Sequence, residues 1–142
     1  MSSERLRHAV CDGETVAQQW PQSAASVRSA RGQLRETLQL WGLVELVDDS
    51  TLVLSELLSN AVEHSRNGDG TVGTRFRRLA GGCGVRIEVH DADAARLPRM
   101  SPATDCDDLR GRGLRIVNAC TRRNWGVDVT SEGKAVWGEV EQ

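Results

Sequence analysis

The sequence predicts an α+β fold, a two-layer α/β sandwich with three helices on one face of a mostly antiparallel sheet of four to five strands. Apolar residues recur with a helical period in three segments and alternate with polar residues in four or five shorter ones. The order is strand, two helices, two strands, a long loop, a helix and two strands. Helices gathered on a single face of the sheet let all these segments share one core.

Length and charge limit the classes of protein to which the chain can belong. Its 142 residues suffice for one domain, and we expect a flexible N-terminus at 1–13 and a single domain at 14–142. The formal net charge of −2 gives no indication of a general nucleic-acid binder. No apolar run is long enough to span a membrane and no signal-peptide core is present, so we expect a cytoplasmic protein. The four cysteines lack the spacing of zinc sites.

Two elements are expected in the first third of the chain. A short strand at 14–20 is ended by Pro21. Ser23 is a suitable N-cap for a helix that runs to about Trp41. Gly42 suits the C-terminal end of that helix.

A second helix, which begins near Asp48, carries polar residues at regular spacing. Glu56, Asn60 and His64 recur every four residues, which places them on one face of a helix. Apolar residues occupy the opposite face: Leu54, Leu57, Leu58, Ala61 and Val62. On its own this pattern favours an ordinary amphipathic helix with a solvated polar side, because periodicity reports burial and not chemistry.

The rest of the regular structure consists mainly of strands. Apolar and polar residues alternate at 72–76 and 85–89 on either side of a glycine-rich turn, which predicts a β-hairpin. A short helix is expected from about Leu114. Two more strands, at about 125–130 and 135–140, close the chain.

Two features between the hairpin and the last helix have candidate chemistry. Asp91 ends the second hairpin strand, where a carboxylate either lines a ligand site or serves as a turn residue. After it, about twenty residues show no period, and loops of this length are usually functional or disordered. Gly111, Arg112 and Gly113 then precede the last helix. Glycines before a helix N-terminus either approach a phosphate or form a flexible connection.

In their order and spacing, these features resemble the histidine-kinase-like ATPase superfamily (Bergerat fold). Within it they resemble the bacterial anti-sigma-factor serine/threonine-protein kinase family. The motifs that carry the resemblance are LLSNAVEH at 57–64, LP at 97–98, GRGL at 111–114, WG at 125–126 and GKAVW at 133–137. The resemblance covers roughly residues 14–140, which is nearly the whole chain.

The resemblance implies roles for individual residues. Asn60 stands where the family's asparagine coordinates Mg²⁺ between the protein and the ATP phosphates, and an amide oxygen suits that hard cation. Glu56 stands where the family's glutamate acts as general base, here on a serine or threonine hydroxyl. Asp91 matches the aspartate that accepts a hydrogen bond from the adenine amino group.

The glycine motif and the helix that follows it would hold the phosphates. Gly111 and Gly113 match the family's lid glycines, and a helix starting near Leu114 would turn its free N–H groups toward the phosphates. Arg112 is our own candidate for a catalytic cation that offsets charge on the transferred phosphoryl group. His64 orients its neighbours, contacts a phosphate or packs against other side chains, and the resemblance leaves these three roles open.

The function that the resemblance implies is ATP-dependent protein phosphorylation with Mg²⁺. Such a kinase binds a sigma factor and keeps it from RNA polymerase. It also phosphorylates a serine on an anti-sigma-factor antagonist, and the phosphorylated antagonist then dissociates from the kinase. We expect no direct contact with nucleic acid or with a membrane. The resemblance also implies a homodimer, because relatives form one.

Two departures from the family pattern favour an alternative. Asp93 replaces a frequent glycine of the adenine motif, and Ala135 stands where a threonine is frequent in the final strand. Both would weaken nucleotide binding. The alternative is a catalytically weak or inactive ATPase-fold binding module that regulates by sequestering a protein. A detached catalytic domain of a histidine-kinase relay ranks last, because the chain lacks a helix pair for dimerisation and phosphoacceptance.

Overall fold

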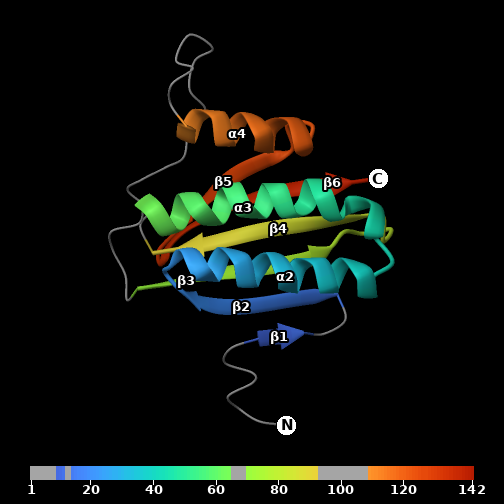
Figure 1. The fold of residues 1–142 in the computed structure, drawn as a ribbon, viewed down its shortest axis with the longest axis horizontal. Coiled ribbons are helices and arrows are strands. Elements are labelled where there is room, and N and C mark those ends of the chain that lie inside the picture. Colours follow the sequence, from blue (N-terminus) through green and yellow to red (C-terminus); the bar gives the residue numbers. More distant parts are fainter. Residues whose placement is uncertain (1–8, 12–13, 65–69, 93–108) are drawn as a thin grey trace.

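The computed structural model of the chain describes residues 9–11, 14–64, 70–92 and 109–142, with side chains for all of these except 9–11, 64 and 109–112. Its elements are β1 (Ala9–Cys11), β2 (Thr15–Pro21), α2 (Ala24–Leu40), η1 (Val44–Leu46), α3 (Val47–His64), β3 (Thr71–Arg78), β4 (Gly84–Asp91), α4 (Leu109–Cys120), β5 (Trp125–Thr130) and β6 (Gly133–Glu141) (Figure 1).

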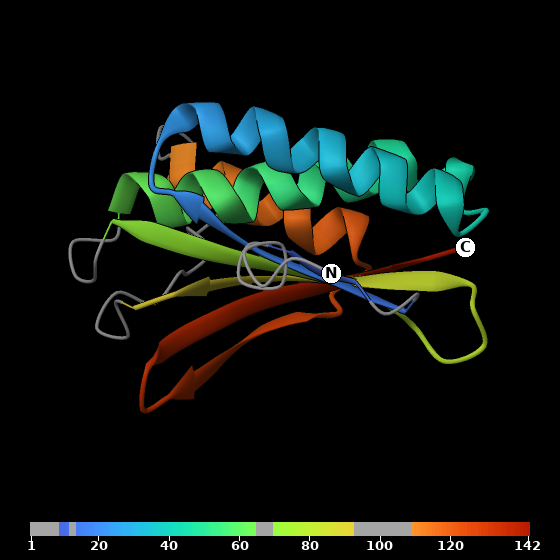
Figure 2. The same ribbon diagram turned by 90° about the horizontal axis from the view of Figure 1, so that it is seen from below.

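The strands form one sheet in the order β1-β2-β3-β4-β6-β5, and all neighbouring pairs are antiparallel. The helices α2, α3 and α4 lie in a layer on one face of this sheet (Figure 2). The predicted two-layer α+β fold is therefore confirmed. The sheet has one strand more than expected, because the short β1, which lies within the segment 1–13, pairs with β2. The division of the chain at residue 14 stays a prediction.

The core lies between the sheet and the helices. Along β3 and β4 every second side chain faces the helices and is buried: Val72, Thr74, Phe76, Val85, Ile87 and Val89. The helices meet them with buried leucines: Leu34 and Leu38 from α2, and Leu54, Leu57 and Leu58 from α3. Burying each large apolar side chain contributes about 1.5–3 kcal/mol. The same alternation turns other polar residues of these strands to the sheet's open face, away from the helices: Arg75, Arg77, Arg86, Glu88 and His90.

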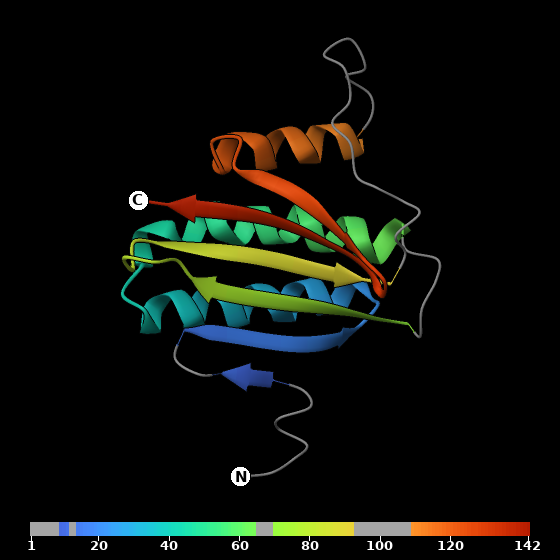
Figure 3. The ribbon, with the colours of Figure 1, turned by 180° about the vertical axis from the view of Figure 1, so that it is seen from behind.

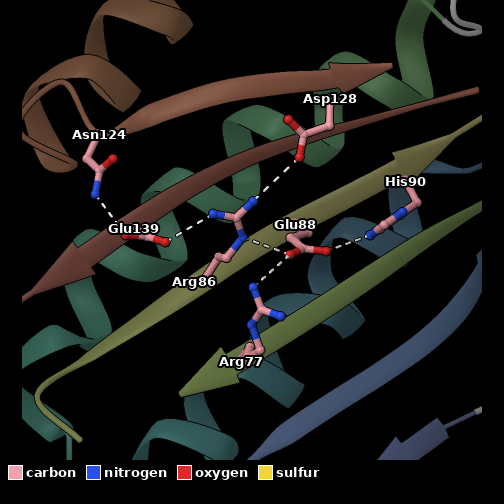
Figure 4. Close-up of polar contacts among 7 residues, drawn as sticks. All are labelled: Arg77, Arg86, Glu88, His90, Asn124, Asp128 and Glu139. Atoms are coloured by element: carbon pink, nitrogen blue, oxygen red, sulfur yellow. Dashed lines mark hydrogen bonds and ion pairs between the residues drawn. The ribbon is translucent and has the colours of Figure 1, made fainter. Parts of the chain in front are cut away.

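A polar network spans the open face (Figure 4). The guanidinium of Arg86 donates from Nε to Glu88 over 2.8 Å and from Nη1 to Glu139 over 3.0 Å, and it stacks 4.1 Å from the ring centre of Trp137. His90 Nε2 lies 2.8 Å from the other oxygen of Glu88. Burial alone raises the pKa of Glu88, but the hydrogen bonds from His90 and Arg86 outweigh it and lower that pKa to about 2.

Replacing Glu88 with glutamine is expected to reduce the free energy of unfolding at neutral pH by about 2 kcal/mol, because the charge that Arg86 and His90 contact is lost. The folded-state pKa of about 2 lies below the ordinary 4.5, so the carboxylate stabilises the fold fully above about pH 5. Its contribution is lost as the pH falls toward the folded-state pKa. The stability difference between wild type and Glu88→Gln should therefore shrink on acidification, measured by urea unfolding at a series of pH values.

The control for this prediction is Asp128→Asn. Asp128 lies 3.7 Å from the same guanidinium, but its side chain is 62% exposed. Its removal should cost less than about 0.5 kcal/mol, because solvent screens an exposed pair. A Glu88→Gln penalty no larger than this, or one that does not vary with pH, would contradict the account of the network.

Candidate functional site

Four elements bring the predicted site residues toward one end of the molecule. The carboxyl ends of α3 and β4 and the starts of β6 and α4 lie at the same end in both Figure 1 and Figure 3. Helix α3 carries Glu56 and Asn60, β4 ends at Asp91, and α4 carries Gly113. The fold therefore gathers residues that are far apart in the sequence.

The polar face of α3 is half-buried. Glu56 and Asn60 both have intermediate exposure, while the leucines on the opposite face are almost inaccessible. An ordinary amphipathic surface helix would instead leave its polar face in water. The apolar half of the expected pattern is confirmed, and the polar half is partly covered. The side chain of His64 lies outside the described residues, so its role stays a prediction.

Glu56 lies directly against the backbone of α4 at Gly113. A Cβ atom added at Gly113 would overlap Glu56 Oε2 and lie 3.3 Å from Glu56 Cδ. Glycine at this position therefore gives the carboxylate its room. Burial, and next the charge of Glu63, raise the pKa of Glu56. A carboxylate with a raised pKa is a better proton acceptor near neutral pH, which suits a general base.

Helix α4 begins earlier than the sequence predicts. It starts at Leu109, so the helix start expected near Leu114 is wrong and Gly111 to Gly113 lie inside the first turns. Glycine costs only about 1 kcal/mol in a helix, which tertiary packing overrides. The N–H groups without an intrahelical acceptor are those of the first four residues, 109–112. Leu114 follows them, and its side chain is buried at 2% exposure.

These bounds leave the phosphate-binding roles of Gly111, Gly113 and Leu114 as predictions. The side chain of Arg112 lies outside the described residues, and so does Asp93. The catalytic role of Arg112 and the effect of Asp93 on the adenine site therefore also stay predictions. The contact of Gly113 with Glu56 is a second reason for a glycine in this motif.

Asp91 forms a buried ion pair with Lys134, which the sequence analysis did not single out. Lys134 Nζ lies 3.2 Å from Asp91 Oδ2, and the side chains are 7% and 2% exposed. The two residues face each other across the pairing of β4 with β6. Gly133 makes this close approach possible: its φ is 142°, and a Cβ there would strike the main-chain carbonyl of Asp91. A sequence signal existed, because Lys134 alternates in step with the inward-facing Val136 and Val140.

Ala135 lies on the opposite face of the sheet from this ion pair. It pairs with His90, whose side chain belongs to the open-face network. Successive residues of a strand point to opposite faces, so the position that borders Asp91 is Lys134. The side chain at position 135 therefore does not lie beside the Asp91 carboxylate, which is expected to hydrogen-bond to adenine.

A family model described as the histidine kinase-like ATPase domain matches residues 20–137 of this chain. The chain belongs to this family. A search of curated proteins finds no significant match. Membership of the histidine kinase-like ATPase family assigns an ATP-binding fold to the chain, and the matched residues extend from the end of β2 into β6.

The donor atoms at the site fit the ligand that the histidine kinase-like ATPase family implies. Mg²⁺ prefers oxygen ligands and commonly uses one or two protein side chains together with substrate phosphates and water. The half-buried Asn60 offers an amide oxygen one helical turn from Glu56. Within the described ranges, no three histidine, cysteine, aspartate or glutamate side chains gather as a metal cage. None of the described helices combines the length and apolar character of a membrane span.

Proposed function

We propose that this protein is an ATP-dependent serine/threonine protein kinase of the anti-sigma-factor type. In the cytoplasm it sequesters a sigma factor and phosphorylates a serine of an anti-sigma-factor antagonist. One observation carries the catalytic part of the proposal. Glu56 is a half-buried carboxylate with a raised pKa, held against Gly113 and one turn from Asn60. That combination supplies a proton acceptor beside a Mg²⁺ ligand.

The proposed mechanism assigns one task to each residue. Asn60 would hold Mg²⁺ through its amide oxygen, and Asp91 accepts a hydrogen bond from the amino group of adenine. Bound Mg²⁺ would supply positive charge to neutralise the phosphates. Glu56 takes the proton of the substrate serine hydroxyl as that oxygen bonds to the γ-phosphorus. The bond from the γ-phosphorus to its bridging oxygen breaks, and ADP leaves with the electron pair.

The experiment that tests this proposal is capture of partners from the protein's own cytosol, with and without Mg·ATP, followed by mapping of phosphorylated residues. The proposal expects a sigma factor among the captured proteins. It also expects a small protein that gains one phosphoserine only when ATP is present and is then released. Capture of the same partners with no phosphate transferred by the wild-type protein would contradict kinase activity.

A second candidate function is sequestration without turnover. The observation that favours it is the low exposure of the Asp91 side chain, 2%, because adenine has to reach that carboxylate for ATP to bind. A binding module of this kind would capture its partner equally with and without ATP. Mutation of Glu56 would leave its regulatory effect unchanged.

A further inference from the structure

We infer that Lys134 is a base-recognition residue, which donates a hydrogen bond to the N1 nitrogen of adenine while Asp91 accepts one from the adjacent amino group. This inference rests on the proposed binding of ATP and adds a specificity-determining residue to that site. It concerns a cation that faces the helices, at the start of β6, where the strand alternation otherwise places apolar residues.

The position of Lys134 is fixed by the fold. The close passage of Gly133 against the main chain of Asp91 sets the register, and the register places the two charged side chains opposite each other. Their separation of 3.2 Å lets the ammonium and the carboxylate hydrogen-bond. A ligand that reaches Asp91 in this geometry also reaches Lys134.

The hydrogen-bonding capacity of the pair matches the edge of adenine. A lysine ammonium has three N–H donors and a carboxylate has about four acceptor sites, so the contact between the two groups uses only part of their hydrogen-bonding capacity. Adenine carries an amino donor beside the N1 acceptor. The Asp91 carboxylate is therefore complementary to the amino group, and the Lys134 ammonium is complementary to N1.

A purely structural role accounts less well for the ion pair. Two charges removed from water lose hydration that their mutual attraction barely repays, and apolar residues of similar volume often serve stability as well or better. A buried acceptor and donor side by side at the site end of the sheet are, by contrast, what recognition of a base requires.

The test compares ATP with an analogue in which a C–H group replaces N1 of adenine (1-deaza-ATP). Dissociation constants are measured by calorimetry for the wild-type protein and for Lys134→Met. We expect the wild type to bind 1-deaza-ATP about tenfold more weakly than ATP. Lys134→Met should bind ATP and 1-deaza-ATP equally, because the donor that distinguishes them is gone.

Controls separate recognition from stability. An analogue altered at N7, on the other side of the base, should lose no more affinity with the wild type than with Lys134→Met. Arg75→Met removes a cation from the open face of the same sheet and should preserve the tenfold preference. If Lys134→Met does not fold, the comparison of ATP with 1-deaza-ATP in the wild type still tests the contact with N1.

The possible failures are distinguishable. A wild type that binds ATP and 1-deaza-ATP equally overturns the role of Lys134 and leaves the proposed kinase function standing. A Lys134→Met variant that weakens both nucleotides by the same factor and keeps the tenfold preference also overturns it, because Lys134 would then act only in the fold. A wild type that binds neither nucleotide overturns the proposed function and this inference together.

Discussion

Replacing Glu56 with glutamine is expected to slow phosphotransfer about 100-fold or more while changing ATP affinity less than about threefold. Glutamine keeps the shape of the side chain against Gly113 but cannot accept the proton of a serine hydroxyl. The measurement is single-turnover transfer of labelled phosphate to the captured protein substrate, paired with calorimetric binding of ATP. Loss of ATP binding with an intact fold would contradict this role and assign Glu56 to ligand positioning.

The pH profile gives an independent check on Glu56. Its pKa is raised, so the rate should increase with pH through a value above the ordinary range of glutamate. The charge of Glu63 contributes to that increase in pKa. The matched variant Glu63→Gln should therefore shift the rise of the profile to lower pH and leave the maximal rate nearly unchanged. An unchanged profile would show that a different group accepts the proton.

Replacing Asn60 with alanine is expected to weaken binding of Mg·ATP about 100-fold, because the ion loses its protein ligand. Binding of ATP in the presence of a chelator should change much less, since Asn60 acts through the metal. Ser59→Ala is the matched control, because Ser59 is its half-buried neighbour on α3. Equal affinities of Asn60→Ala and wild type for Mg·ATP would contradict the assignment.

The elements of the fold were predictable where the apolar period is long. Alternation over 72–76 and 85–89 indicated the hairpin of β3 and β4, and helical periods indicated α2 and α3. Two features lacked such a signal. The three residues of β1 are too few to show a period. The start of α4 lies before the predicted one, because glycine has a low helix propensity in isolated sequence, whereas this helix runs through Gly111 and Gly113.

The candidate site was predictable only in part. Spacing along the sequence shows which residues share one face of a helix, but it does not show which elements contact each other. The four-residue spacing of Glu56 and Asn60 placed them on one face of α3. The position of the Glu56 carboxylate against α4 depends on the tertiary packing of two helices that are far apart in the sequence. The pairing of Asp91 with Lys134 depends on the register of β4 with β6, which no local pattern encodes.

Binding of Mg·ATP is the central claim, and thermal unfolding of the wild-type protein tests it most directly. At a nucleotide concentration about 100 times the dissociation constant, binding should stabilise the fold by about 2.7 kcal/mol and raise Tm by roughly 9 °C. The rise should be much smaller with a chelator present or in Asn60→Ala. A wild-type Tm that stays the same at millimolar ATP and Mg²⁺ would contradict the account.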